Sequence, residues 1–280
     1  MSHPNEEIPK GRIKLPKSDP SFERVVRHAR HAVFSVVRQR KIDATQGMAI
    51  ALGSGFFLSP TVFVTAWHVI ASANAPHQDG DSYALVSNLH GTVTAVVVEN
   101  CIVGQQVHLF PDHDMAIILV DGNPDRAYLP VGYGELPEGR EIGVLGYPLA
   151  RIIKAPNGQL STGGLIFRAT TGVVTASYEA NVILDANQQM SAKIIEVNFL
   201  FVPGNSGGPI IDLTNGRVVG LVKGFQPYKI AERLETANLL ETPLPPEVHP
   251  VYIMPHTAIY SIGIRLEQAR EDLERFNVKI

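Results

Sequence analysis

The hydrophobic positions of this chain fall in many short runs, and turn residues separate the runs. Gly53, Gly55 and Pro60 interrupt the early ones. Short apolar or alternating runs with turn signals between them are typical of an all-β barrel or sandwich, and not of alternating βαβ units. The predicted strands are residues 32–37, 48–52, 55–58, 62–66, 83–86, 93–98, 116–120, 142–146, 165–169, 173–176, 194–201, 209–211, 218–222 and 251–254.

Both ends of the chain depart from the strand pattern. Residues 1–20 combine Pro, Lys, Glu and Ser with little apolar content, which predicts a mobile tail. Ser21 can cap a short helix that runs to Ala29. Near the C-terminus, apolar residues recur at helical spacing and predict an amphipathic helix; they are Ile262, Leu266, Ala269, Leu273 and Phe276.

This many strands in 280 residues predicts two antiparallel β-barrels. The Pro- and Gly-rich stretch 129–139 is the natural connector between them. We therefore expect a tail over residues 1–20, a first barrel over 21–128, a second barrel over 129–256 and a terminal helix over 257–280.

Composition limits the kinds of binding partner and the cellular compartment that we expect for this chain. Hydrophobic residues make up 45% and charged residues 18%, as in ordinary globular proteins, and the net charge of −3 gives no field that attracts nucleic acid. Cys101 is the only cysteine, which fits a reducing compartment. The N-terminal residues do not resemble a signal peptide, and no apolar run is long enough for a membrane helix. These features predict a cytoplasmic protein with no nucleic-acid or membrane partner.

The segment 202–209, Val-Pro-Gly-Asn-Ser-Gly-Gly-Pro, surrounds Ser206 with glycines. Glycines let backbone amides turn toward a reacting oxygen, and two such donors beside a serine hydroxyl would form an oxyanion hole. The competing interpretation is a Gly-rich turn between two strands. Because a serine is a weak nucleophile without an adjacent base, the catalytic interpretation requires a histidine and a carboxylate elsewhere in the chain.

Two residues of the predicted first barrel meet that requirement. His68 follows an apolar strand directly, although a lone histidine there is more often a packed core residue. Asp114 precedes another apolar strand, where it is either a turn residue or a buried charge. The order His68, Asp114, Ser206 is the chain order of the chymotrypsin type of triad and differs from that of subtilisins and α/β-hydrolases.

Five motifs in this order resemble those of trypsin/chymotrypsin-fold serine peptidases, nearest to the HtrA/Deg-like type. They surround His68, Asp114 and Ser206 and include two strands of the second barrel. The motifs are residues 53–58 with 64–70, 114–118, 138–148, 171–176 and 204–209. The resemblance implies an all-β fold of two six-stranded antiparallel barrels with a short helix at each end and the triad between the barrels. No further binding module follows the second barrel within these 280 residues.

The resemblance also implies roles for the residues. His68 would accept the proton of Ser206 and pass it to the leaving amine, while Asp114 would orient His68. Backbone amides of the loop Gly204, Asn205 and Ser206 would form the oxyanion hole, with Gly204 and Ser206 as its donors. No metal or organic cofactor is needed. The substrate would be a protein or peptide; a regulatory protein partner and the oligomeric state remain open.

Substrate selection would depend on a pocket beside Ser206. The family's pattern puts Leu200 at its base and Gly224 and Phe225 on its wall, which predicts a preference for apolar residues. Lys223 is unusual here: it can point away, bind substrate or approach Asp114. The alternative function is a catalytically silent peptidase-fold module that binds protein ligands, because a fold alone does not establish an activity.

Overall fold

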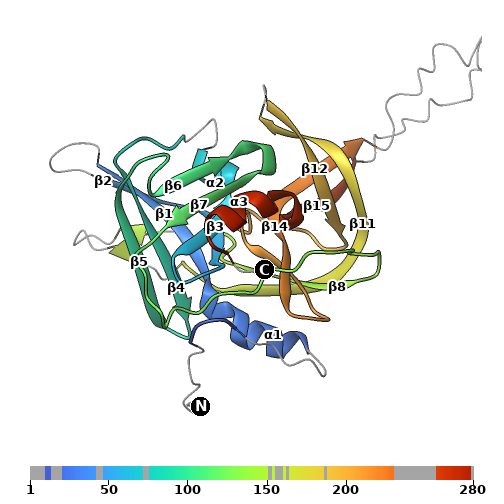
Figure 1. The fold of residues 1–280 in the computed structure, drawn as a ribbon, viewed down its shortest axis with the longest axis horizontal. Helices are drawn as coiled ribbons and strands as arrows, with labels where there is room; N and C mark the ends of the chain where they lie inside the picture. The colour runs from blue at the N-terminus through green and yellow to red at the C-terminus, as the bar shows by residue number, and fades with distance from the viewer. Residues whose placement is uncertain are drawn as a thin grey trace, which may run out of the picture.

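Strands dominate this computed structural model, as the hydrophobic pattern predicts (Figure 1). It describes residues 10–13, 21–41, 47–71, 76–150, 153–154, 160–161, 164–185, 188–229 and 257–278. Within these ranges no helix is long and apolar enough to cross a bilayer. The predicted strand 251–254 and most of the Pro-rich stretch 226–250 lie outside them.

The first β unit is a seven-stranded antiparallel sheet in the order β5-β4-β1-β2-β3-β7-β6. A closed six-stranded barrel was the expectation, and the sheet differs because β5 and β6 form its two edges. The chain turns between them at Gly104, with a φ of 85°, and only an isolated bridge joins Val103 to Val107. The strands are β1 (Val33–Lys41), β2 (Gly47–Phe57), β3 (Val62–Ala66), β4 (Asp81–Leu89), β5 (Thr92–Cys101), β6 (Val107–Phe110) and β7 (Met115–Leu119).

The second β unit is a closed barrel of six strands in the order β11-β12-β15-β14-β13-β8, as predicted. Closure pairs each strand with a neighbour on both sides over part of its length, which protects that part from pairing with other chains. Its strands are β8 (Glu141–Gly146), β11 (Arg168–Asp185), β12 (Gln188–Val197), β13 (Pro209–Asp212), β14 (Arg217–Lys229) and β15 (Thr257–Arg265). Two short strands, β9 (Ile153–Lys154) and β10 (Leu160–Ser161), pair separately.

The boundary predicted at residue 257 is wrong, because β15 completes the second barrel. Ile262 and Ile264 are both buried and alternate with Gly263, which is the period of a strand and not of a helix. The helical spacing begins only at Leu266, with η4 (Leu266–Ala269) and α3 (Arg270–Arg275). The predicted terminal helix is therefore real but short, and Ile262 does not belong to it.

The N-terminal helix forms where it was predicted. In α1 (Phe22–Ala29), the hydroxyl of Ser21 accepts a hydrogen bond from the amide of Arg24. A short turn, η1 (Arg30–Ala32), then leads into β1. The expectation of a mobile tail is wrong for residues 10–13, because the amide of Ile13 donates to the carbonyl of Tyr128 at 3.0 Å and its side chain is buried.

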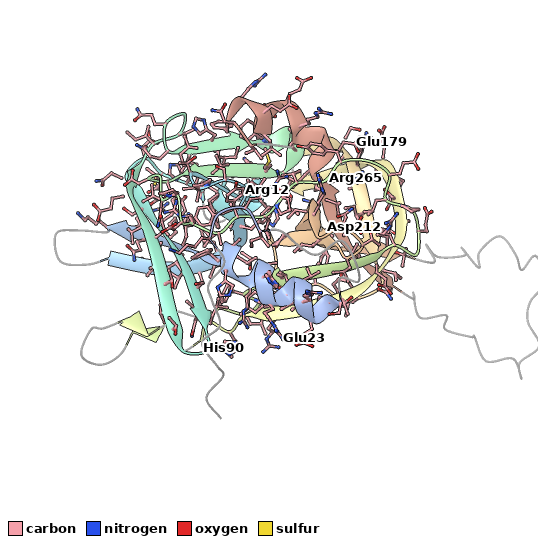
Figure 2. The ribbon with its side chains drawn as sticks, turned by 60° about the horizontal axis from the view of Figure 1, so that its bottom comes forward. Arg12, Glu23, His90, Glu179, Asp212 and Arg265 are labelled. Carbon is pink, nitrogen blue, oxygen red and sulfur yellow. The ribbon has the colours of Figure 1, made fainter. Side chains whose placement is uncertain are left out.

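Connections between the two units hold the molecule together. The connector 129–139 contacts both: Leu129 donates to the Phe57 carbonyl, and Gly132 donates to the Val218 carbonyl. The helix α3 also lies between the labelled strands of the two units (Figure 1). Arg265, labelled in Figure 2 at the end of β15, donates to the carbonyl of Gly134 in the connector. The relative placement of the units is thus fixed by backbone and side-chain contacts.

Candidate active site

His68 and Asp114 meet because of the register between two strands. Strands β3 and β7 are antiparallel, and Ala66, the last residue of β3, pairs with Met115, the first of β7. The residues that follow Ala66 and those that precede Met115 therefore lie side by side at this end of the sheet. This brings His68 close to Asp114, 46 positions later in the chain. His68 lies in α2 (Trp67–Ala71), and Asp114 ends the 3-10 turn η2 (Pro111–His113).

Asp114 is a fully buried carboxylate with several partners. Both of its oxygens lie 3.0 Å from Nδ1 of His68, and Oδ1 also accepts the backbone amide of His68 at 3.1 Å. Its φ of 43° is a left-handed value that aspartate tolerates better than most residues. It is thus both a turn residue and a buried charge, the two interpretations that the sequence left open.

Charges around Asp114 determine its protonation. Burial alone would raise the pKa of this carboxyl group. The charge and hydrogen bonds of His68, together with the charge of Lys223, outweigh burial and hold the pKa of Asp114 below its ordinary value. The carboxylate is therefore ionised at neutral pH and can hold the imidazole of His68 in one orientation.

Ser206 reaches this region on the open end of a hairpin. Strands β13 and β14 pair from Asp212–Arg217 to Pro209–Leu221, and the pairing continues through Gly208 and Gly207 to Val222. Ser206 therefore lies beside Lys223. Its hydroxyl donates to the Lys223 carbonyl at 3.1 Å and forms no hydrogen bond with His68. Catalytic hydrogen bonds are often long or absent before substrate binds, so this resting geometry does not exclude His68 as the base.

Ser54 joins the two β units directly behind Ser206. Its backbone amide donates to the Ser206 carbonyl at 2.8 Å. Its buried hydroxyl donates to the Gly204 carbonyl at 2.6 Å and accepts the Tyr147 amide at 2.8 Å. Gly207, with a φ of 80°, packs so closely here that a Cβ atom would collide with the Ser54 carbonyl and Thr65. The serine loop (Gly204, Asn205 and Ser206) is therefore held in place by β2 of the first unit.

Two backbone amides of the serine loop have no acceptor among the described residues, those of Gly204 and Ser206. The Asn205 amide, which the sequence placed in the same oxyanion hole, instead donates to the Val202 carbonyl at 3.0 Å and is not available. The loop thus supplies two donors, and Asn205 is not one of them.

Leu149 fixes the peptide unit that carries the Gly204 amide. Its own amide donates to the Pro203 carbonyl at 2.7 Å. Because the carbonyl and N–H of one trans peptide point in opposite directions, this bond turns the Gly204 amide away from Leu149. Leu149 has a φ of 55°, an unfavourable conformation for leucine that the surrounding structure must maintain.

The residues predicted to bind substrate differ in their exposure and in their contacts. Leu200 is 62% exposed and does not close the base of a pocket, although its side chain is accessible to a ligand. Lys223 takes the third of its three open options: its Nζ lies 3.3 Å from Oδ2 of Asp114. Gly224 and Phe225 follow in β14, as expected for a strand beside Ser206, and the Phe225 side chain lies outside the description.

Sequence reasoning singled out His68, Asp114 and Ser206 as candidates but gave no role to Ser54 and Leu149. The Gly-Ser-Gly sequence at 53–55 was visible as a motif, yet its serine had no assigned role. Leu149 carries no chemical signal in the sequence because it acts through its backbone. Among the described residues, no group of three His, Cys, Asp or Glu side chains is arranged to hold a metal ion.

Residues 53–221 match the family model for the trypsin-like peptidase domain. The match covers more than half of the chain and includes His68, Asp114 and Ser206. The chain belongs to the trypsin-like peptidase family. The resemblance inferred from the sequence motifs is thereby confirmed.

Solved structures agree with this trypsin-like fold. The chain is similar to the active form of the Rv3671c protease from M. tuberculosis, with 19% identity, coverage of 98% of this chain and 93% of that chain, and a TM-score of 0.56. It is also similar to the HtrA-type protease AlgW with a decapeptide, with 17% identity, coverage of 91% and 66%, and a TM-score of 0.55. Identities this low establish the fold alone.

A sequence relative is the uncharacterized protein y4bJ of Sinorhizobium fredii. It is 30% identical over 179 residues, which are 63% of this chain and 22% of that protein. The trypsin-like chain thus spans about a fifth of the length of this curated relative.

Proposed function

We propose that this chain is a serine endopeptidase that hydrolyses peptide bonds through an acyl-enzyme intermediate. Ser206 is the nucleophile, His68 the general base and then the general acid, and Asp114 the residue that orients His68. The observation that carries the proposal is the contact of a fully buried, ionised Asp114 with Nδ1 and the backbone amide of His68. A carboxylate so placed fixes the imidazole with Nε2 free to act as a base.

The reaction follows from these groups. His68 takes the hydroxyl proton as Ser206 attacks the scissile carbonyl, and the resulting imidazolium is stabilised by the charge of Asp114. The unengaged amides of Gly204 and Ser206 are the donors for the oxyanion that forms. His68 then protonates the leaving amine, and water hydrolyses the acyl-enzyme by the same steps in reverse order. For His68 to act, the Ser206 hydroxyl must exchange its resting hydrogen bond to the Lys223 carbonyl for one to His68.

The substrates of this site are peptide segments with an apolar residue before the scissile bond. Leu200, which is accessible to a ligand, presents an apolar surface and no charge to pair with a Lys or Arg of the substrate, and Lys223 is engaged with Asp114. Sequencing the products of a denatured protein digest tests this preference. We expect cuts mainly after apolar residues; cuts mainly after Lys or Arg would contradict the role of Leu200.

A second candidate is the silent module that binds protein ligands. One observation favours it: the Ser206 hydroxyl bonds to the Lys223 carbonyl and not to His68. A permanent arrangement of this kind would leave Ser206 without its base. The two candidates differ in whether Ser206 reacts, so a single chemical probe separates them.

A fluorophosphonate probe tests the proposal on the whole chain. We expect covalent labelling of wild type and none of Ser206→Ala or His68→Ala, with hydrolysis of casein lost by several orders of magnitude in both, because the triad acts as a unit. Asp114→Asn should cost roughly 10⁴-fold in kcat, through the wrong tautomer of His68. Wild type that folds but neither labels nor cleaves casein would favour the silent module.

A further inference from the structure

Lys223 occupies an irregular position in the barrel wall. In the pairing of β14 with β15, Val222 faces Gly263 and Gly224 faces Ile262, so Lys223 is the extra residue of a bulge. Bulges bend a strand and re-aim a side chain, and they are frequent next to active sites. The bulge at Lys223 thus changes the direction in which its ammonium group points.

The ammonium group of Lys223 contacts the same carboxylate as His68. Its Nζ lies 3.3 Å from Oδ2 of Asp114, and the side chain is only 13% exposed. The carbonyl of the same residue accepts the Ser206 hydroxyl at 3.1 Å. Lys223 therefore contacts Asp114 through its side chain and Ser206 through its backbone.

The ion pair opposes a role for Lys223 in reading an acidic substrate. If Nζ turned into the substrate groove, it would leave Oδ2 of a fully buried carboxylate without this partner. Unpairing a buried charge is costly, so the pair with Asp114 is the favoured state. The charge of Lys223 is therefore directed at the proposed catalytic residues.

We propose that Lys223 is a positioning residue that extends the activity of this peptidase toward lower pH by placing a second positive charge on Asp114. The inference rests on the proposed function of the same site. A base must be neutral to accept the Ser206 proton, and a second cation on the shared carboxylate opposes protonation of His68. Removal of that cation should therefore raise the pH below which Ser206 loses its reactivity.

The charged groups that act on this carboxylate come from two elements. His68 contacts it from α2 and Lys223 from β14. His113, the neighbour of Asp114 in the chain, pairs instead with Asp272 of α3 at 3.3 Å. Lys223 is thus the one permanent positive charge on Asp114 among the described residues, and a neutral substitution removes that charge selectively.

The test compares the pH dependence of fluorophosphonate labelling in wild type, Lys223→Met and Lys223→Arg. Both variants keep the backbone carbonyl that accepts the Ser206 hydroxyl. We expect the acidic limb of the Lys223→Met profile to move up by about one pH unit, and Lys223→Arg to keep the wild-type limb. Lys193→Met is the matched control, because it removes a half-exposed lysine of β12 in the same barrel that pairs with Glu267 of η4.

A purely structural role for Lys223 would lower the labelling rate equally at every pH and leave the limb in place, which would overturn the inference. If Lys223 instead recognised acidic substrate residues, Lys223→Met would lose cuts after Glu or Asp while the acidic limb of its pH profile stayed in place. That result would overturn the inference as well.

An NMR titration of the His68 ring in the same proteins does not depend on turnover. If wild type fails to label, the proposed function falls, and the titration still decides the effect of Lys223. A midpoint that moves up in Lys223→Met supports the inference, whereas an unchanged midpoint contradicts it.

Discussion

Ser54 is a buried residue whose hydroxyl serves two backbone groups at once. It donates to the Gly204 carbonyl and accepts the Tyr147 amide, so it links the serine loop to β8 and its extension. Neither group has an alternative side-chain partner in the described structure. The hydroxyl therefore contributes both to stability and to the geometry of the proposed oxyanion hole.

We expect Ser54→Ala to lower the free energy of unfolding by about 1–3 kcal/mol, because it leaves buried polar groups without partners. It should also slow fluorophosphonate labelling of folded protein, since the Gly204 carbonyl, which lies between the two proposed oxyanion-hole amides, loses its hydrogen bond. Urea unfolding and labelling kinetics measure the two effects. Ser35→Ala is the matched control: Ser35 is equally buried, but its hydroxyl makes only a 3.4 Å bond to the Gly53 carbonyl. Equal losses in both variants would contradict the role given to Ser54.

His77 is a second buried residue with a testable consequence, this time for pH. Its side chain is 3% exposed, and its Nδ1 lies 2.8 Å from the Tyr83 hydroxyl. Burial lowers the pKa of His77 below its ordinary value of 6.5, and the nearby Arg38 and Arg40 act in the same direction against Asp81 and Asp79. The folded protein thus holds this imidazole neutral where the unfolded chain would protonate it.

The sign follows from proton linkage. At pH values between the lowered pKa of folded His77 and 6.5, the unfolded chain binds more protons than the folded protein does. The contribution of neutral His77 to stability is therefore present above pH 6.5 and is lost as the pH falls. We expect the free energy of unfolding to decrease with falling pH in this window, and His77→Gln to reduce that slope. Urea titrations at several pH values measure it; identical slopes in both proteins would refute the contribution of His77.

At the scale of elements, α3 is too short to be stable alone and depends on its packing. Leu273 is fully buried, the Phe276 ring lies tilted beside His108 with ring centroids 4.7 Å apart, and Asp272 pairs with His113. The terminal turn thus covers β6 and η2, the segment that ends at Asp114. An element of the second unit therefore supports the carboxylate carried by the first.

We expect Leu273→Ala to lower the free energy of unfolding by about 2–5 kcal/mol, the usual range for removing a fully buried leucine side chain. Arg275→Ala, on the exposed face of the same helix, should change it by about 0.5 kcal/mol or less. Thermal or urea unfolding gives both values. A small effect of Leu273→Ala would mean that α3 does not hold the η2 segment.

At the scale of the whole molecule, hydrogen bonds cross between the two β units at the proposed catalytic residues themselves. Ser54 on β2 holds Ser206 and Gly204, and the connector pairs with Phe57 on one side and Val218 on the other. Neither unit has a complete set of partners for its buried polar groups without the other. The two units should therefore unfold together.

Trp67 offers a direct test of that cooperativity, because it is the only tryptophan and lies in α2 of the first unit. We expect its fluorescence and the far-UV circular dichroism of the whole chain to give coincident urea transitions. A separate, earlier transition of Trp67 would show that the first unit unfolds independently.

The sequence by itself determined most of the strands, the helix at Ser21 and the order of the three candidate catalytic residues, but it missed β6 and β15. Alternation and turn residues are local signals, so they predict strands directly, and His68, Asp114 and Ser206 lie in recognisable motifs. Local signals failed where closure mattered: Ile262 fitted a helical spacing, yet β15 was needed to complete the barrel.

Only the tertiary structure decided how the first sheet ends, which amides are free and where Lys223 points. The first unit stays open because β5 and β6 do not pair, and Asn205 loses its amide to Val202. Lys223 approaches Asp114 because a bulge in β14 and the register of β13 bring them together. These outcomes depend on contacts between segments distant in the chain, which no spacing along the sequence encodes.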